Sequence, residues 1–91
     1  MNLEELYKII EQRKKNLPKN SYVAYLFKKG REKIIQKVEE ESTEVIMAAK
    51  NESKQRIILE ISDLTFHLLI FMSLFQIKPK DILRELGKRS K

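Results

Sequence analysis

Two pairs of carboxylates recur with helical spacing in this sequence. Glu41 and Glu44 are three residues apart, and the same spacing separates Glu60 from Asp63. Three residues turn a side chain only about 60° around a helix, so the members of each pair point the same way. If the two helices are antiparallel neighbours, the four carboxylates converge. Oxygen ligands in a chain without cysteine suit a hard cation, so the pattern predicts a site for Mg²⁺, with Mn²⁺ as a second candidate.

A structural network of ion pairs is the alternative interpretation of the same carboxylates. Glu60 and Asp63 fall within an apolar segment that contains Ile57, Ile61 and Leu64. Charges in such surroundings are costly unless they are paired or bound to metal. The pattern alone leaves both interpretations open.

Catalytic roles are predicted for the acidic run on the earlier segment. Glu40, Glu41 and Glu44 are the candidate catalytic residues. Glu40 resembles solvated helix surface, and a carboxylate of this kind that is not fully engaged with metal could orient or deprotonate a water molecule. Glu40 and Glu44 are the candidates for this base, and the sequence does not choose between them.

Three further residues project near the carboxylates. Lys33 and Lys37 can contact substrate phosphates, or they can pair with nearby glutamates, as Lys37 with Glu41 at a spacing of four residues. His67 lies one turn beyond Asp63 on the same face. A lone histidine on an apolar helix is more often a hydrogen-bonded core residue than a metal ligand. His67 is therefore predicted either to hydrogen-bond to a metal ligand without contacting the metal, or only to pack in the core.

Helices must position these residues, because Gly and Pro are rare and apolar residues follow helical spacing. Ser21 and Ser53 are predicted helix caps, and Gly30 is a predicted helix end. The fold class is therefore all-α, with four to five helices. The first predicted helix begins at Leu3 and has about four turns. The other four span Ser21 to Phe27, about Arg31 to Lys50, about Lys54 to Gln76, and Lys80 to about Leu86.

Size and charge restrict the class of protein. Residues 1–91 are predicted to form a single domain, and the formal charge of +6 favours an anionic partner. The N-terminus lacks the pattern of a signal peptide, and the apolar run Leu64 to Ile77 is short for a membrane span, so a soluble cytoplasmic protein without membrane contact is expected. Residues Leu64 to Phe75 are apolar nearly all round, which predicts a helix covered across a homodimer interface.

Three linked stretches resemble phosphoribosyl-ATP pyrophosphatases, within the wider MazG-like superfamily of all-α nucleotide pyrophosphohydrolases. They are SYVAYLFKKG at 21–30, KIIQKVEEESTEVIMAAKN at 33–51 and EISDLTFHLL at 60–69. The resemblance implies a dimeric MazG-like helical bundle and Mg²⁺-dependent hydrolysis of phosphoribosyl-ATP to phosphoribosyl-AMP and pyrophosphate, the second step of L-histidine biosynthesis. It also implies a stand-alone form without a fused cyclohydrolase domain.

The resemblance implies roles for particular residues. The metal ligands would be Glu41, Glu44, Glu60 and Asp63, with Glu40 as a nearby helper. The predicted substrate-binding residues are Ser21, Tyr22, Lys33, Lys37, Lys50 and Asn51. Glu39 and Val23 depart from the family pattern, which usually has Gly and Thr at these positions.

Two other functions remain open from the sequence. The acidic pattern fits equally a housekeeping pyrophosphatase that acts on non-standard nucleoside triphosphates. The net charge also permits a basic helical module that binds nucleic acid, although the basic residues are scattered and no recognition motif is present. Binding of nucleic acid is therefore not expected.

Overall fold

The computed structural model describes residues 1–51 and 53–90, which form five helices and no strands. This confirms the all-α prediction. The helices are α1 (Leu3–Asn16), α2 (Tyr22–Lys29), α3 (Arg31–Lys50), α4 (Lys54–Leu74) and α5 (Pro79–Gly87). The 14 residues of α1 give the predicted length of about four turns. The largest differences from the predicted boundaries are two residues, at α2, which continues past Phe27 to Lys29, and at α4, which ends at Leu74 rather than at Gln76.

Local capping chemistry sets most of the helix starts. The side chains of Asn2, Ser21 and Ser53 accept hydrogen bonds from backbone N–H groups three residues later, at 2.8, 3.1 and 3.3 Å. These bonds satisfy donors that a helix leaves free in its first turn. The predicted caps Ser21 and Ser53 are thus confirmed. Gly30, with φ of 101°, lies between α2 and α3 and adopts a backbone conformation that other residues rarely reach.

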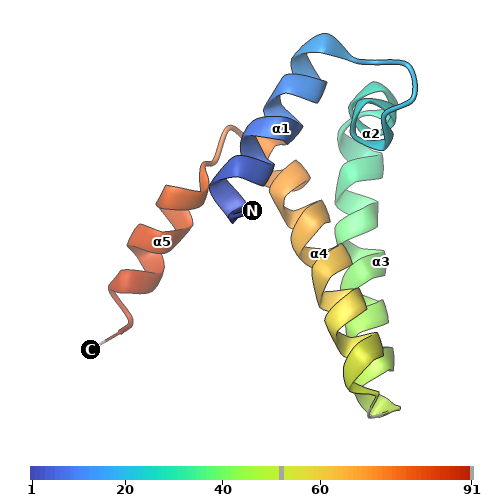
Figure 1. The fold of residues 1–91 in the computed structure, drawn as a ribbon, viewed down its shortest axis with the longest axis vertical. Helices are drawn as coiled ribbons and strands as arrows, with labels where there is room; N and C mark the ends of the chain where they lie inside the picture. Colours follow the sequence, from blue (N-terminus) through green and yellow to red (C-terminus); the bar gives the residue numbers. More distant parts are fainter. Residues whose placement is uncertain (52, 91) are drawn as a thin grey trace.

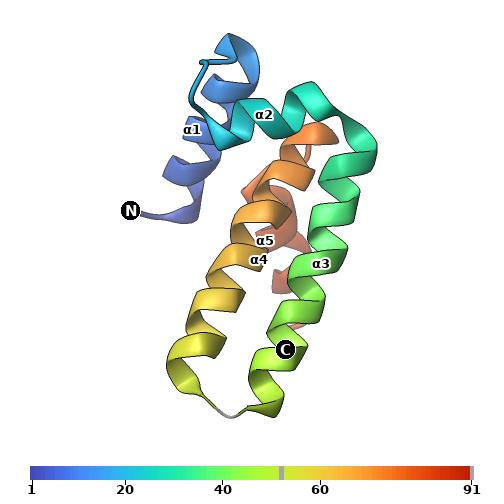
Figure 2. The same cartoon turned by 90° about the vertical axis from the view of Figure 1, so that its right-hand side faces the viewer.

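Helices α3 and α4 form a long antiparallel hairpin, and their mutual packing is the most extensive in the molecule (Figure 1). Helices α1 and α2 cover the end of the hairpin that lies away from its turn (Figure 2). The main core is at this end. Its most completely buried large side chains are Ile10, Leu26, Ile34 and Ile70, one from each of the first four helices. The hairpin is therefore anchored at one end by a four-helix core.

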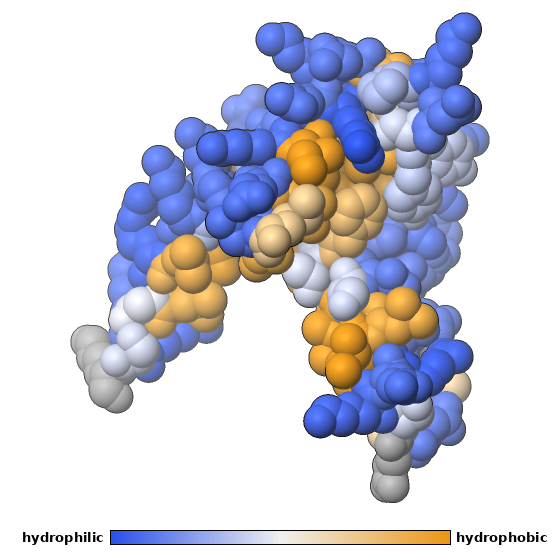
Figure 3. Space-filling view, in the orientation of Figure 1, coloured by the Kyte–Doolittle hydropathy of each residue, from blue (hydrophilic) through white to orange (hydrophobic). Residues whose placement is uncertain are grey.

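Helix α5 diverges from the hairpin, and apolar residues line both sides of the space between them (Figures 1 and 3). Within a single chain, α4 is not buried on every side. Leu68 is 39% exposed, and Ile58, Leu59 and Ile61 are about half exposed. These last three residues precede the run Leu64 to Phe75 that the sequence predicted to be covered. Within that run, Leu68 and Phe75 are exposed and the other residues are buried or half-buried in the single chain.

Helix α4 is the one helix among the described residues that is long and apolar enough to cross a membrane. The apolar run Leu64 to Ile77 is by itself too short for a membrane span, whereas the whole helix reaches the required length. A core or interface helix of a soluble protein has the same properties. Length and composition therefore do not decide where α4 resides.

Candidate metal centre

The α3–α4 hairpin brings three of the predicted ligands together. One carboxylate oxygen from each of Glu41, Glu60 and Asp63 lies within 4.8 Å of the other two. Glu60 is only 8% exposed, and the other two residues are half-buried. Two oxygens on opposite sides of one Mg²⁺ are about 4.2 Å apart, so the three oxygens are close to the span that one cation requires. The donor set therefore fits a hard divalent cation.

Glu44 and Glu40 have different surroundings. Glu44 is exposed on α3 and is not one of the three grouped carboxylates. Glu40 is also exposed, and one of its oxygens lies 3.1 Å from the Lys37 ammonium. The structure thus brings together three of the four predicted ligands and leaves two carboxylates at the edge of the group.

Two cations flank the carboxylates. Lys37 Nζ is 3.6 Å from Glu41, as the spacing of four residues suggested, and the Arg56 guanidinium donates to Glu60 at 3.2 Å. Burial alone would lower the pKa of Lys37, but its hydrogen bond to Glu40 and the nearby charges of Glu40 and Glu41 raise that pKa above its usual value. Lys37 therefore remains a cation at the edge of the site.

Arg56 was not among the residues predicted for the site, although its spacing of four residues from Glu60 is typical of an ion pair on a helix. Asp63 forms no ion pair with any residue in the two described segments of the chain. Two cations thus face four carboxylates, those of Glu40 and the three grouped residues. The site retains negative charge that a divalent cation would neutralise.

His67 is behind the carboxylates and links them to α2. Its Nδ1 is 2.7 Å from the backbone carbonyl oxygen of Asp63, and its Nε2 is 2.7 Å from the Tyr22 hydroxyl. Burial raises the pKa of Tyr22, while the charge of Lys37 lowers it and that of Glu41 raises it. Tyr22 is thus near enough to the site for the charges of Lys37 and Glu41 to affect the pKa of its hydroxyl.

The other predicted substrate residues are less closely tied to the carboxylates. Ser21 accepts the capping hydrogen bond of α2, and Lys33 is half-buried one turn before Lys37. Lys50 and Asn51 are exposed at the far end of α3. Lys50 follows Glu41 by nine residues, or about 14 Å along the helix axis. The structure does not bring Lys50 and Asn51 to the carboxylates.

The sequence of this chain matches one family of known proteins. The model of the phosphoribosyl-ATP pyrophosphohydrolase family matches residues 3–90. The phosphoribosyl-ATP pyrophosphatase of Clostridium novyi (strain NT) is 49% identical over 98% of this chain and 81% of its own length. That of Sulfolobus acidocaldarius is 45% identical over 98% of this chain and 94% of its own length.

A longer protein contains a similar region. The histidine biosynthesis bifunctional protein HisIE of Caldanaerobacter subterraneus is 47% identical over 98% of this chain, and the match covers 43% of the longer protein. The matches to these relatives and to the family model all include the segment that carries the three grouped carboxylates. The chain belongs to the phosphoribosyl-ATP pyrophosphohydrolase family.

Proposed function

We propose that Glu41, Glu60 and Asp63 bind the Mg²⁺ with which this chain, a phosphoribosyl-ATP pyrophosphatase of histidine biosynthesis, cleaves its substrate. Mn²⁺ suits the same oxygen ligands. The convergence of three carboxylates from two helices carries the proposal. We include Glu44 as a fourth ligand, because it is one turn from Glu41 on the same helix.

The reaction is the attack of water on the α-phosphorus of phosphoribosyl-ATP. The bond from that phosphorus to the oxygen that bridges to the β-phosphate breaks, and pyrophosphate leaves with this oxygen while phosphoribosyl-AMP remains. A bound Mg²⁺ supplies neutralisation of charge on the phosphate oxygens. Glu40 and Glu44 are exposed beside the three grouped carboxylates. Whichever of the two is not fully engaged with the metal can orient the water and accept its proton.

Positive side chains complete the environment of the phosphates. Lys37 already contacts two carboxylates of the site, and Lys33 is one turn away on α3. We assign both ammonium groups to phosphate oxygens, where they would stabilise developing negative charge. The Ser21 hydroxyl accepts the cap bond and keeps its own proton available to a substrate acceptor. Lys50 and Asn51 are assigned to the part of the substrate farthest from the broken bond.

The carboxylates do not by themselves separate phosphoribosyl-ATP from other nucleotides. A housekeeping nucleoside triphosphate pyrophosphatase would use the same ligands, but family membership supports phosphoribosyl-ATP. The test is pyrophosphate release from phosphoribosyl-ATP and from a panel of nucleoside triphosphates, with and without Mg²⁺. We expect Mg²⁺-dependent release from phosphoribosyl-ATP at a much higher kcat/KM. Faster release from a nucleoside triphosphate would contradict the assignment.

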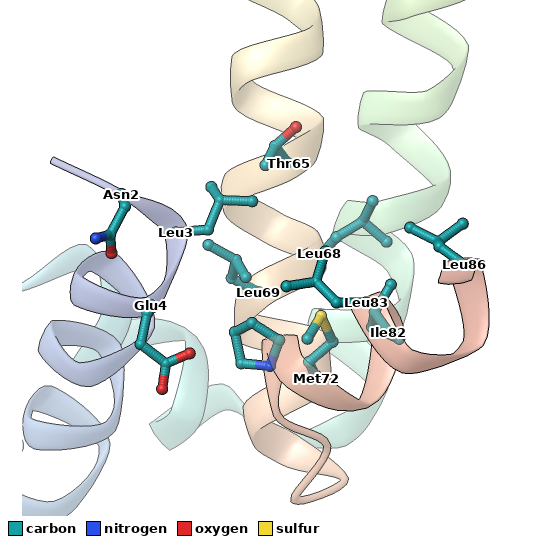
Figure 4. A pocket seen from close by; sticks show the side chains of 11 residues that line it. Asn2, Leu3, Glu4, Thr65, Leu68, Leu69, Met72, Ile82, Leu83 and Leu86 are labelled. Carbon is teal, nitrogen blue, oxygen red and sulfur yellow. The ribbon is translucent and has the colours of Figure 1, made fainter. Parts of the chain in front are cut away.

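We also propose that the chain is a homodimer. An apolar groove of about 500 Å³ lies between α1, α4 and α5, with Leu3, Leu68 and Leu83 pointing into it (Figure 4). Leu83 is 68% exposed, and further apolar residues continue along α4 towards the hairpin turn (Figure 3). Uncovered apolar surface of this extent favours a partner, and a second copy would also add core to a short chain.

The dimer also accounts for the apolar character of α4 without a membrane. Glu60, Asp63 and the paired Arg56 would be costly inside a bilayer, whereas they suit a site open to water. We therefore infer a soluble, cytoplasmic enzyme that binds neither membrane nor nucleic acid. Light scattering during size-exclusion chromatography should give twice the chain mass, and Leu83→Glu should yield monomer. A monomeric wild type would contradict the dimer.

A further inference from the structure

When the His67 imidazole is neutral, its two hydrogen bonds have a defined direction. The carbonyl oxygen of Asp63 can only accept, so His67 Nδ1 must carry the proton in their 2.7 Å contact. In the neutral imidazole, Nε2 then has a lone pair and no proton. The Tyr22 hydroxyl, 2.7 Å from Nε2, must therefore donate to it. The tautomer of His67 thus determines where the Tyr22 proton points.

Because the Tyr22 hydroxyl donates its proton to His67, its oxygen can only accept a further hydrogen bond. A phenol has a single proton, and His67 takes it. The remaining lone pair of the oxygen can accept a hydrogen bond but cannot donate one. Among residues 1–51 and 53–90, His67 is the hydrogen-bond partner of this hydroxyl. Phosphate oxygens are acceptors, so they do not match what Tyr22 offers.

The Tyr22 ring is held in place yet open to a ligand. It lies near-parallel to the rings of Tyr25 and Phe66, with centroids 6.2 and 6.4 Å away, and it meets His67 edge-on at 5.5 Å. His67 itself is only 7% exposed, whereas Tyr22 is 44% exposed. His67 therefore orients the hydroxyl from the buried side, while the tyrosine as a whole is partly exposed beside the carboxylate site.

From this geometry we propose that Tyr22 accepts a hydrogen bond from a sugar hydroxyl of the nucleotide substrate, and that His67 is the positioning residue that orients it. The inference rests on the proposed function, because phosphoribosyl-ATP carries ribose hydroxyls as donors beside phosphates that are only acceptors. The pair then helps to recognise the sugar, while the lysines of α3 recognise phosphate. A site that recognised phosphate alone would have no use for an oriented acceptor.

Two substitutions of His67 separate its two hydrogen bonds. His67→Asn keeps a donor near the position of Nδ1 for the Asp63 carbonyl but loses the acceptor for Tyr22. His67→Gln places an amide oxygen near the position of Nε2 and keeps that acceptor. Tyr22→Phe removes the hydroxyl, and Tyr25→Phe is the matched control, since Tyr25 is equally exposed on the same helix. We expect Tyr22→Phe and His67→Asn to raise KM about three- to tenfold with little change in kcat.

The coupling between the two residues is the discriminating result. His67→Gln should restore KM towards the wild-type value, and His67→Asn should have no further effect on KM in the Tyr22→Phe background. With substrate analogues that each lack one ribose hydroxyl, the KM penalty of Tyr22→Phe should disappear for one analogue. Additive effects of the two substitutions, or a penalty that persists for every analogue, would overturn the proposal.

Failure of this inference is distinguishable from failure of the proposed function. If the wild-type chain does not release pyrophosphate from phosphoribosyl-ATP, the function itself is wrong. If the wild type is active and Tyr22→Phe behaves like Tyr25→Phe, only the role of Tyr22 and His67 is wrong. Thermal unfolding of each variant, measured in parallel, identifies any KM change that comes from a damaged fold.

Discussion

Helix α4 carries two polar clusters that differ in their balance of charge. Near its C-terminal end, the fully buried Ser73 hydroxyl donates to the Glu11 carboxylate, and Lys14 donates to the Ser73 carbonyl oxygen at 2.7 Å. Lys14 also lies 3.8 Å from Glu11, so this cluster has one cation for one anion. Towards the N-terminal end of α4, two cations face the carboxylates of Glu40 and the three grouped residues.

The difference separates a structural cluster from a binding site. Around Ser73, each charged group has a partner within the chain, and the bonds tie α1 to α4. Among the grouped carboxylates, Asp63 has no cationic partner within the described segments, and the excess negative charge favours binding of a cation from solution. Removing a group should therefore destabilise the fold at the first cluster and abolish activity at the second.

Asp63→Asn should have the largest effect on activity. It removes a predicted ligand, so kcat/KM for phosphoribosyl-ATP should fall by more than about 100-fold, since even changes to groups behind a metal's ligands cost 10- to 100-fold. Without metal, the melting temperature should stay the same or rise, because a carboxylate is removed from a group of like charges. Pyrophosphate release and calorimetry measure the two effects.

Glu39→Gln is the matched control, because Glu39 is an exposed carboxylate on α3 outside the three grouped residues. Its turnover should remain within about twofold of wild type, as for other surface changes away from a site. A large loss of turnover in this variant, or near-normal turnover in Asp63→Asn, would break the contrast between the clusters.

Ser73→Ala should reduce stability more than activity. It removes a fully buried hydroxyl that donates to the Glu11 carboxylate, and because that carboxylate is itself about half exposed, the cost is roughly 1 kcal/mol in the free energy of unfolding. For a chain of this size, 1 kcal/mol lowers the melting temperature by about 4–8 °C. Urea unfolding measures the loss, and turnover at 25 °C should change by less than about twofold.

Ser62→Ala provides the control for this prediction. Ser62 is on the same helix but is exposed, and its hydroxyl donates only to the Ile58 carbonyl of its own helix. We expect its unfolding free energy to stay within about 0.5 kcal/mol of wild type. Equal losses from Ser62→Ala and Ser73→Ala would show that the Ser73 cluster does not tie α1 to α4.

Arg56→Gln should produce the smallest effect, and it should strengthen metal binding rather than weaken it. Arg56 competes with a metal ion for Glu60, but it is about half exposed and its ion pair is weak. Losing this cation should tighten Mg²⁺ binding by about two- to fivefold. The Mg²⁺ concentration that gives half-maximal turnover measures the change. Arg84→Gln, which alters a pair with Asp81 on α5, should leave it unchanged.

Local features of the fold could be predicted from the sequence, because they depend on neighbours along the chain. The caps Ser21 and Ser53 and the pair of Lys37 with Glu41 all follow from spacings of three or four residues. How α3 is rotated against α4 depends on packing across the hairpin. Spacing within each helix therefore could not show that Glu41 joins the group while Glu44 remains exposed.

Contacts between distant parts of the chain could not be predicted from the spacing of residues. Tyr22 and His67 are 45 residues apart and meet only because α2 packs across the hairpin. The divergence of α5 likewise depends on how Pro79 and the preceding turn direct the chain, and the amphipathic pattern of the helix does not specify it. These features have no periodic signature, since they arise from tertiary packing.

If Glu41, Glu60 and Asp63 hold a divalent cation, the protein must bind Mn²⁺ through these carboxylates. Free Mn²⁺ can be measured by electron paramagnetic resonance as it is titrated into wild-type protein and the Asp63→Asn and Glu39→Gln variants. We expect Mn²⁺ binding by wild type and Glu39→Gln, competition by Mg²⁺, and loss of this binding in Asp63→Asn. Equal Mn²⁺ binding by Asp63→Asn and wild type would contradict the assignment of these ligands.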